Sequence, residues 1–225
     1  MAKHAILLAA LLLALSSGAR ALPCAPLTPT VKLAIAEPIL DRSLDGRALR
    51  QTAPNIHISP NGLILGLYHG ALKIEVNSGT ITRTNPGPPV QSSATCLSRF
   101  DITISLNPII YILHDIAPGG CADQVVWAHE YNHHRIEIAK INEALPSYLL
   151  SNPLPLEAFA GRTRQESSLA AQAYANAYVA ALDQSLTNFI QPAQTAFDSP
   201  AEHRRIRSIC PAEVDQISTK NRPPK

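Results

Sequence analysis

The 225-residue chain lacks a cluster of basic residues, because its Lys and Arg side chains are scattered along the sequence. Its formal net charge of +2 is close to zero. Proteins that bind nucleic acid usually carry a basic patch or stripe on one face. We therefore expect no nucleic-acid partner.

A long apolar run occurs at only one place, residues 5–15, directly after Lys3 and His4. The run is too short to span a bilayer, which takes about 20 residues. The sequence Ala19-Arg20-Ala21 follows, and a basic start, an apolar middle and a small-x-small end are typical of a secretory signal peptide. We therefore expect a signal peptide over residues 1–21, cleavage after Ala21, no stable membrane insertion afterwards, and a secreted or periplasmic protein.

Cysteine pairs of the CxxC type, which many zinc sites use, are absent from the sequence. Four cysteines follow the signal peptide: Cys24, Cys96, Cys121 and Cys210. An even number of cysteines in an oxidising compartment favours disulfides. Sequence alone allows three pairings, of which we expect Cys96 with Cys121 and Cys24 with Cys210.

Residues 22–117 are predicted to be rich in β-strands. The candidate strands alternate in hydrophobicity or are rich in β-branched residues, and they cover residues 31–36, 63–68, 71–76, 80–84, 100–106 and 109–113. His69-Gly70 suggests a hairpin, and Asn77-Ser78-Gly79 suggests a turn. We expect these strands to form an antiparallel β-rich half.

Residues 118–219 are predicted to be helical. Asp123 can cap a helix that runs to about Leu145, where Pro146 follows. A second helix is expected over residues 163–190, a shorter one over residues 200–209, and a disordered tail over residues 220–225. The apolar residues Tyr174, Tyr178, Leu182, Leu186 and Ile190 recur every four positions and predict a buried face on the second helix. The whole pattern predicts a single α+β domain over residues 22–219.

The first predicted helix contains an HExxH sequence, His129-Glu130-Tyr131-Asn132-His133. Residues four apart are offset by only about 40° around a helix. His129 and His133 therefore project from one face and can reach the same metal ion. Glu130 lies on the flank of that face, close enough to contact a metal-bound water.

This spacing predicts a Zn2+ site with a catalytic carboxylate. Zinc held by neutral imidazoles with one open coordination position lowers the pKa of its bound water to about 7. Glu130 could accept that proton and pass it to a leaving amine. The neighbours Val125, Val126 and Ile136 indicate a buried helix, in which histidine and glutamate without partners would be costly.

A third zinc ligand must come from another part of the chain. His134-Arg135-Ile136 follows the second histidine, so the extended HExxHxxGxxH arrangement of metzincins is excluded. Glu137 lies one turn beyond His133 and would reach the ion only awkwardly. The better candidates lie after the second helix, within residues 197–203.

An HExxH helix, followed by a second helix and by the aromatic-Asp-x4-His element from Phe197-Asp198 to His203, resembles a family of predicted secreted bacterial zinc-dependent proteases. The resemblance covers mainly residues 96–205. It implies a zincin-like fold, with His203 as the third zinc ligand. Asp198 is then either a neighbour of the ligands or the alternative third ligand.

Three functions remain open at this point. The first is an exported zinc peptidase that holds an extended peptide along an edge strand, either residues 100–106 or residues 109–113. The second is a non-catalytic zinc-binding envelope protein, whose open position is filled by Asp198 together with His203. Zinc-dependent hydrolysis of peptidoglycan cross-links ranks last, because a single Trp and few aromatics argue against carbohydrate contact. The sequence does not indicate an oligomeric state.

Overall fold

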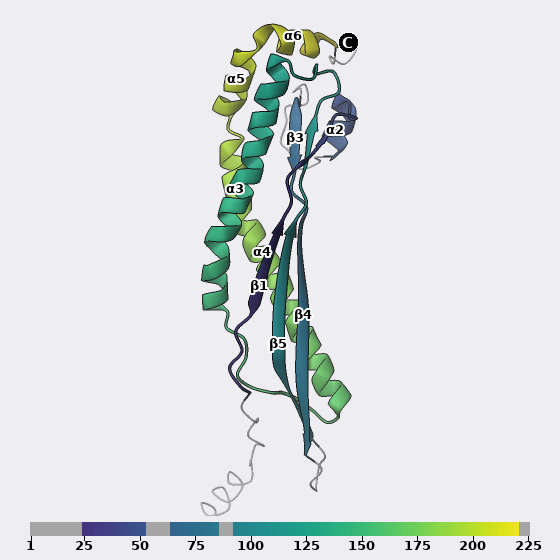
Figure 1. The fold of residues 1–225 in the computed structure, drawn as a ribbon, viewed down its shortest axis with the longest axis vertical. Coiled ribbons are helices and arrows are strands. Elements are labelled where there is room, and N and C mark those ends of the chain that lie inside the picture. Colours follow the sequence, from purple (N-terminus) through teal and green to yellow (C-terminus); the bar gives the residue numbers. More distant parts are fainter. Residues whose placement is uncertain (1–23, 53–63, 86–91, 221–225) are drawn as a thin grey trace, which may run out of the picture. The chain divides into compact units, whose positions relative to one another are not determined.

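A computed structural model of the chain describes residues 24–52, 64–85 and 92–220. Helices and β-sheets both occur, which confirms the predicted α+β class (Figure 1). The predicted signal peptide and residues 221–225 of the predicted tail lie outside the described residues. The remaining tail residue, Lys220, ends a helix instead.

The chain divides into two compact units. The first comprises Met1–Pro29, Asn77–Phe100 and Leu154–Asn176, and the second comprises Thr30–Val76, Asp101–Pro153 and Ala177–Lys225. The prediction of a single domain over residues 22–219 stays a prediction.

The first unit is built on antiparallel strands and the start of a long helix. It contains parts of β4 (Leu72–Asn85) and β5 (Ser92–Leu106), together with β7 (Phe159–Gly161), which pairs antiparallel with β5. Inside the unit, the hydroxyl of Thr95 donates to Oγ of Ser167 over 2.8 Å. This bond pairs two polar groups that would otherwise be buried without partners.

The second unit contains parallel strand pairs, so the predicted purely antiparallel arrangement is wrong. β1 (Thr30–Ile35) runs parallel to residues 101–106 of β5, and β2 (Ile39–Asp41) runs parallel to β6 (Ile109–Ile112). Parallel pairing needs a long connection between the two strands. The chain between β2 and β6 is long enough, because it includes the unpredicted helix α2 (Gly46–Thr52) and three strands.

The hairpin predicted at His69-Gly70 is also wrong. β3 (Gly66–His69) pairs antiparallel with β6, in the order β2-β6-β3, whereas β4 belongs to the order β1-β5-β4. The turn predicted at Asn77-Ser78-Gly79 lies inside β4, where Oδ1 of Asn77 accepts a hydrogen bond from Arg99 of β5 over 2.9 Å. Pairing with a long neighbouring strand has overridden the local turn signals.

Two long helices dominate the second half, and both contain a proline. α3 (Cys121–Ser151) continues through Pro146, and α4 (Arg164–Phe197) continues through Pro192, so both predicted C-terminal ends are too early. A proline removes one hydrogen bond without always ending a helix. Contacts beyond the proline hold the end of α3 in place, because the rings of Tyr148 and Tyr178 meet edge to face at 5.6 Å.

Shorter elements complete the helical half. α5 (Pro200–Ile209) has the predicted bounds, and α6 (Pro211–Lys220) follows it without having been predicted. Of the predicted buried face of α4, Tyr178, Leu182, Leu186 and Ile190 are buried, whereas Tyr174 is half-buried. In the second unit α3 packs against β3 and β6 and also contacts α5 and α6 (Figure 1).

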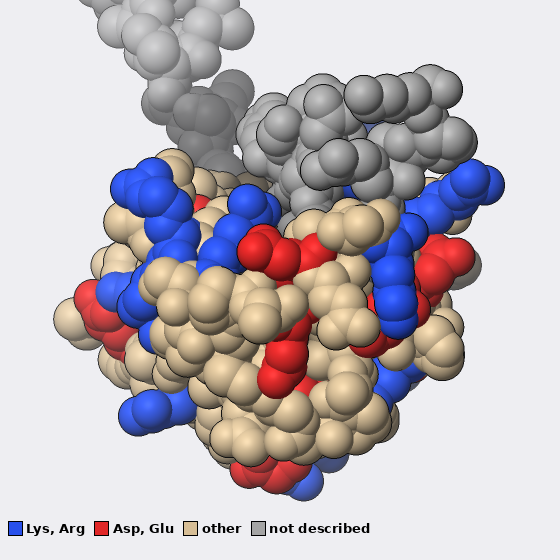
Figure 2. Space-filling view, turned by 90° about the horizontal axis from the view of Figure 1, so that it is seen from above, with Lys and Arg blue, Asp and Glu red and all other residues tan. Residues whose placement is uncertain are grey.

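Two further features of the described residues are the apolar length of the helices and the distribution of surface charge. None of the described helices is long and apolar enough to cross a bilayer. On the face that Figure 2 shows, Lys and Arg side chains lie among Asp and Glu side chains instead of gathering in one stripe. This mixture fits the formal net charge of +2.

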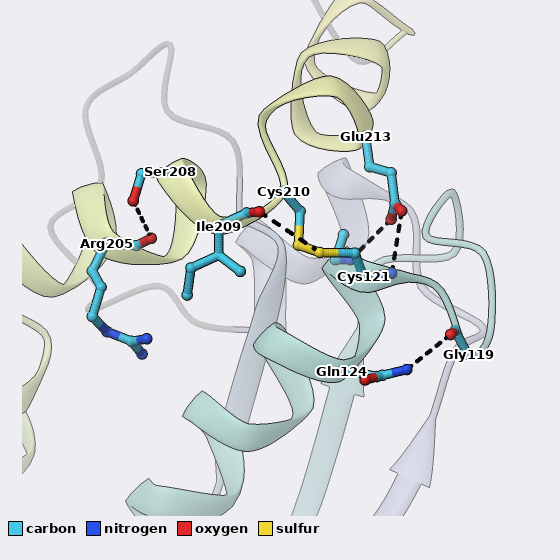
Figure 3. Close-up of a disulfide and its surroundings, with 9 residues drawn as sticks. Gly119, Cys121, Gln124, Arg205, Ser208, Ile209, Cys210 and Glu213 are labelled. Carbon is cyan, nitrogen blue, oxygen red and sulfur yellow. Dashed lines mark hydrogen bonds between the residues drawn. A yellow bond between two sulfur atoms is a disulfide. The ribbon is translucent and has the colours of Figure 1, made fainter.

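The predicted disulfide pairing is wrong. Cys24 pairs with Cys96, and Cys121 pairs with Cys210 (Figure 3). The Cα atoms are 5.6 Å apart in the first pair and 5.8 Å apart in the second, both within the range that a disulfide needs. Cys210 meets Cys121 because α5 packs against α3, a contact that the sequence pattern did not reveal. Two disulfides fit an oxidising compartment.

The start of α3 is capped by a residue from α6. Gly120 occupies the N-cap position without a side-chain cap, and the carboxylate of Glu213 accepts from the backbone N–H groups of Cys121 (3.2 Å) and Ala122 (2.9 Å) (Figure 3). Asp123, the predicted cap, instead accepts from the N–H of Gly119 and pairs with Arg42. Glu213 thus satisfies two N–H groups that a helix start leaves without partners.

Replacing Glu213 by alanine is expected to lower the free energy of unfolding by about 1 kcal/mol, because two helix N–H groups lose a charged acceptor. Urea denaturation of the disulfide-intact protein measures this loss. Asp215→Ala is the matched control, since Asp215 is an exposed carboxylate on the same helix. Equal stability of the two variants would contradict the capping role.

Candidate metal site

The two histidines and the glutamate of the HExxH sequence lie buried in the first half of α3. His129 and His133 are each 5% exposed and Glu130 is 6% exposed. The Nε2 atoms of the two histidines are 3.3 Å apart, as the helical spacing predicted. Two imidazoles therefore present the same ring nitrogen to one point.

The segment after α4 brings two more candidate ligands to this point. Oδ1 of Asp198 lies 2.9 Å from Nε2 of His133 and 3.2 Å from Nε2 of His129. Nε2 of His203, on α5, lies 3.8 Å from the same oxygen, and its side chain is 53% exposed. Asp198 thus contacts both histidines, whereas His203 lies at the rim.

These side chains can hold a metal ion. The ligand atoms of His129, Glu130 and His133 lie within 4.8 Å of one another, and so do those of His129, Asp198 and His203. Imidazole nitrogens and carboxylate oxygens are the ligands of many zinc sites. The converging atoms therefore fit a divalent cation in their chemistry as well as in their spacing.

Burial and the neighbouring charges shift the pKa values of Glu130, Asp198 and His133. Burial raises the pKa of Glu130 to about 7, although the nearby histidines lower it. Burial also raises the pKa of Asp198, but hydrogen bonds with His129 and His133 outweigh burial and hold this pKa below its usual range. For His133, burial lowers the pKa, and contacts with Asp198 and Glu130 raise it overall. Asp198 therefore adds a negative charge beside two imidazoles.

Aromatic rings hold both histidines from the sides. Phe197, the last residue of α4, stacks on His129 with ring centroids 4.8 Å apart and meets the edge of His133 at 4.9 Å. Tyr68 of β3 lies parallel to His133 with centroids 6.1 Å apart. This packing restricts the rotation of each imidazole.

β3 lies very close to α3 at Glu130. A Cβ atom at Gly66 would lie 2.5 Å from Cγ1 of Val126 and 2.8 Å from Oε1 of Glu130, closer than real Cβ contacts allow. Glycine at this position therefore lets the strand lie directly on the helix. The backbone of Tyr68 also lies close enough to lower the pKa of Glu130, against the effect of burial.

The remaining acidic and histidine candidates have other contacts. Glu137, considered above as a ligand with an awkward reach, accepts a 2.6 Å hydrogen bond from the hydroxyl of Tyr68. His134 is buried, and its Nδ1 lies 3.4 Å from the same hydroxyl. Neither belongs to a group that could hold a metal ion within the part of the chain that the structure describes.

Two side chains that contact the histidines were not among the predicted site residues. Gln194 of α4 lies against His133, and Glu202 of α5 lies against His129. Residues 199–202 read Ser-Pro-Ala-Glu, the pattern of a capping box, which could have drawn attention to Glu202. The hydroxyl of Ser199 does accept from the backbone N–H of Glu202. For Gln194 the sequence holds no comparable signal.

No family model, no curated protein and no solved structure matches the chain. The resemblance to secreted zinc-dependent proteases and the zincin-like fold therefore stay predictions.

Proposed function

We propose that the protein is an exported zinc-dependent metallopeptidase, with Glu130 as its general base. One observation carries the proposal: Nε2 of His129, Nε2 of His133 and Oδ1 of Asp198 lie within 3.3 Å of one another. Buried Glu130 lies beside this point, where a purely structural metal site would not require it. Export rests on the predicted signal peptide and is supported by the two disulfides.

Asp198 is the third ligand in this proposal, ahead of His203. Its carboxylate contacts both histidines, whereas the imidazole of His203 is half exposed and farther away. Two histidines and one carboxylate form a common catalytic zinc site, which leaves a fourth position for water or substrate.

The chemistry of hydrolysis is divided between the ion and Glu130. Bound zinc supplies a Lewis acid that polarises a carbonyl and activates water. Glu130 accepts a proton from the attacking water and delivers it to the leaving amine. The close approach of Gly66 restricts the space around the carboxylate of Glu130.

The strand that would hold a peptide differs from the one expected from the sequence. β5 lies between β1 and β4, and β6 lies between β2 and β3, so neither is an edge strand. β3 ends the order β2-β6-β3 among the described residues, and it contacts α3. In the proposal β3 takes the peptide-binding role, since an edge strand can pair with an extended peptide.

Glu130→Gln is expected to keep its zinc and to lose hydrolysis by about 100-fold or more, because the amide cannot accept the proton. Zinc-loaded mature protein would be tested on fluorescein-labelled casein and on a mixture of short peptides followed by mass spectrometry. Glu143→Gln is the control, since Glu143 is an exposed glutamate on the same helix, paired with Lys140. Cleavage by Glu130→Gln at the wild-type rate would contradict its role as the base.

A second candidate function is a non-catalytic zinc-binding protein of the envelope. It is favoured by the position of His203, whose Nε2 lies 3.8 Å from Oδ1 of Asp198. With His203 as a fourth ligand beside His129, His133 and Asp198, a tetrahedral site would be complete. Structural zinc sites are closed in this way, without a position for water.

Zinc content of two variants separates these functions. The peptidase proposal expects zinc to be lost in Asp198→Ala and kept in His203→Ala, because three ligands hold the ion. Loss of zinc in both variants would indicate four protein ligands and favour the non-catalytic protein. Loss of zinc in His203→Ala alone would indicate that His203, and not Asp198, is the third ligand. Metal analysis after dialysis measures this, with His114→Ala as the control for removal of an exposed histidine.

A further inference from the structure

The orientation of the His133 ring is set by one side-chain amide. Nδ1 of His133 lies 2.5 Å from Oε1 of Gln194, and Nε2 of Gln194 donates to the backbone carbonyl of His133 over 3.0 Å. A carbonyl only accepts hydrogen bonds, so the amide nitrogen must face it and the amide oxygen must face the ring. Nδ1 of His133 therefore carries the hydrogen.

For His129, a carboxylate takes the place of the amide as the partner of Nδ1. Its Nδ1 lies 3.3 Å from Oε1 of Glu202, whose two oxygens pair with Arg205 over 2.5 and 2.6 Å. A carboxylate paired in this way accepts hydrogen bonds and donates none. Nδ1 of His129 therefore carries the hydrogen as well.

With the hydrogen on Nδ1, Nε2 of each neutral ring carries the lone pair that a metal ion needs. Nε2 of His129, Nε2 of His133 and Oδ1 of Asp198 lie within 3.3 Å of one another. A cation at this point would replace the hydrogen bonds between the two Nε2 atoms and Asp198. The outer contacts of the two rings thus decide which nitrogen atoms face the ion.

We propose that Gln194 and Glu202 are positioning residues for zinc, which hold the hydrogen on Nδ1 of His133 and His129 and so present both Nε2 atoms to the ion. This inference rests on the zinc site proposed above and extends it to residues that do not ligate. Outer partners of this kind typically account for about 10- to 100-fold in metal affinity.

The placement of these residues favours the same role. Gln194 lies before Asp198 and Glu202 after it, so residues 194–202 would supply a ligand together with the support for both histidines. Ser199 caps α5 by accepting from the backbone N–H of Glu202. This cap fixes the start of α5 and with it the carboxylate that faces His129.

The test is the zinc affinity of the mature protein, measured by competition with a chromophoric chelator. Gln194→Leu removes the acceptor, and we expect about 10- to 100-fold weaker binding. Gln194→Glu keeps an acceptor oxygen and should stay within a few-fold of the wild type. Gln184→Leu makes the same change at an exposed position of α4, where the amide donates to Asn188, and should bind like the wild type.

Glu202→Leu provides a second variant in case Gln194→Leu fails to fold. It should weaken zinc binding by a similar factor, because His129 loses its acceptor. The absorption spectrum of the cobalt-substituted protein should change in both leucine variants. Thermal unfolding of the metal-free proteins shows whether the fold itself has changed.

The outcomes separate this inference from the proposed function. If the wild type binds zinc and both folded leucine variants bind equally tightly, the positioning role is wrong while the zinc site stands. If the wild type binds no zinc, the proposed function and this inference both fail. Weaker binding in both leucine variants, restored in Gln194→Glu, supports the positioning role.

Discussion

Two histidines and a glutamate are buried within one helix of the second unit, and the segments around this helix supply their partners. Polar side chains without partners in such a place would cost several kcal/mol, roughly 2–7 for each group on transfer scales. Residues 194–202 supply the partners that offset this cost. Asp198 contacts the Nε2 atoms of both histidines, and Gln194 and Glu202 contact the Nδ1 atoms. These contacts leave the Nε2 atoms of His129 and His133 directed at a single point, which suits a metal ion.

Contacts on two sides of α3 keep this arrangement in place. On one side, the disulfide between Cys121 and Cys210 joins the first residue of α3 to the end of α5, and Glu213 caps the same helix end. On the other side, Gly66 allows β3 to lie against Val126 and Glu130. The helix that carries the candidate ligands is therefore held by elements from distant parts of the sequence.

Local patterns predicted the parts of this structure that local geometry controls. The convergence of His129 and His133 follows from the helical repeat, and the start of α5 follows from its proline and cap. Strand partners and disulfide pairs were predicted wrongly, because they depend on which distant segments meet. Pro146 lies inside α3 for a similar reason, since packing with α4 holds the helix beyond it. Gln194 was missed because a glutamine gains its role only through the histidine that it contacts.

X-ray absorption spectroscopy of the purified mature protein would show whether the cluster around His129 and His133 holds zinc. We expect one zinc per chain with only nitrogen and oxygen ligands, at about 2.0–2.1 Å, and scattering from at least two imidazoles. No bound zinc after reconstitution, or zinc bound through sulfur, would rule out a zinc site at these histidines.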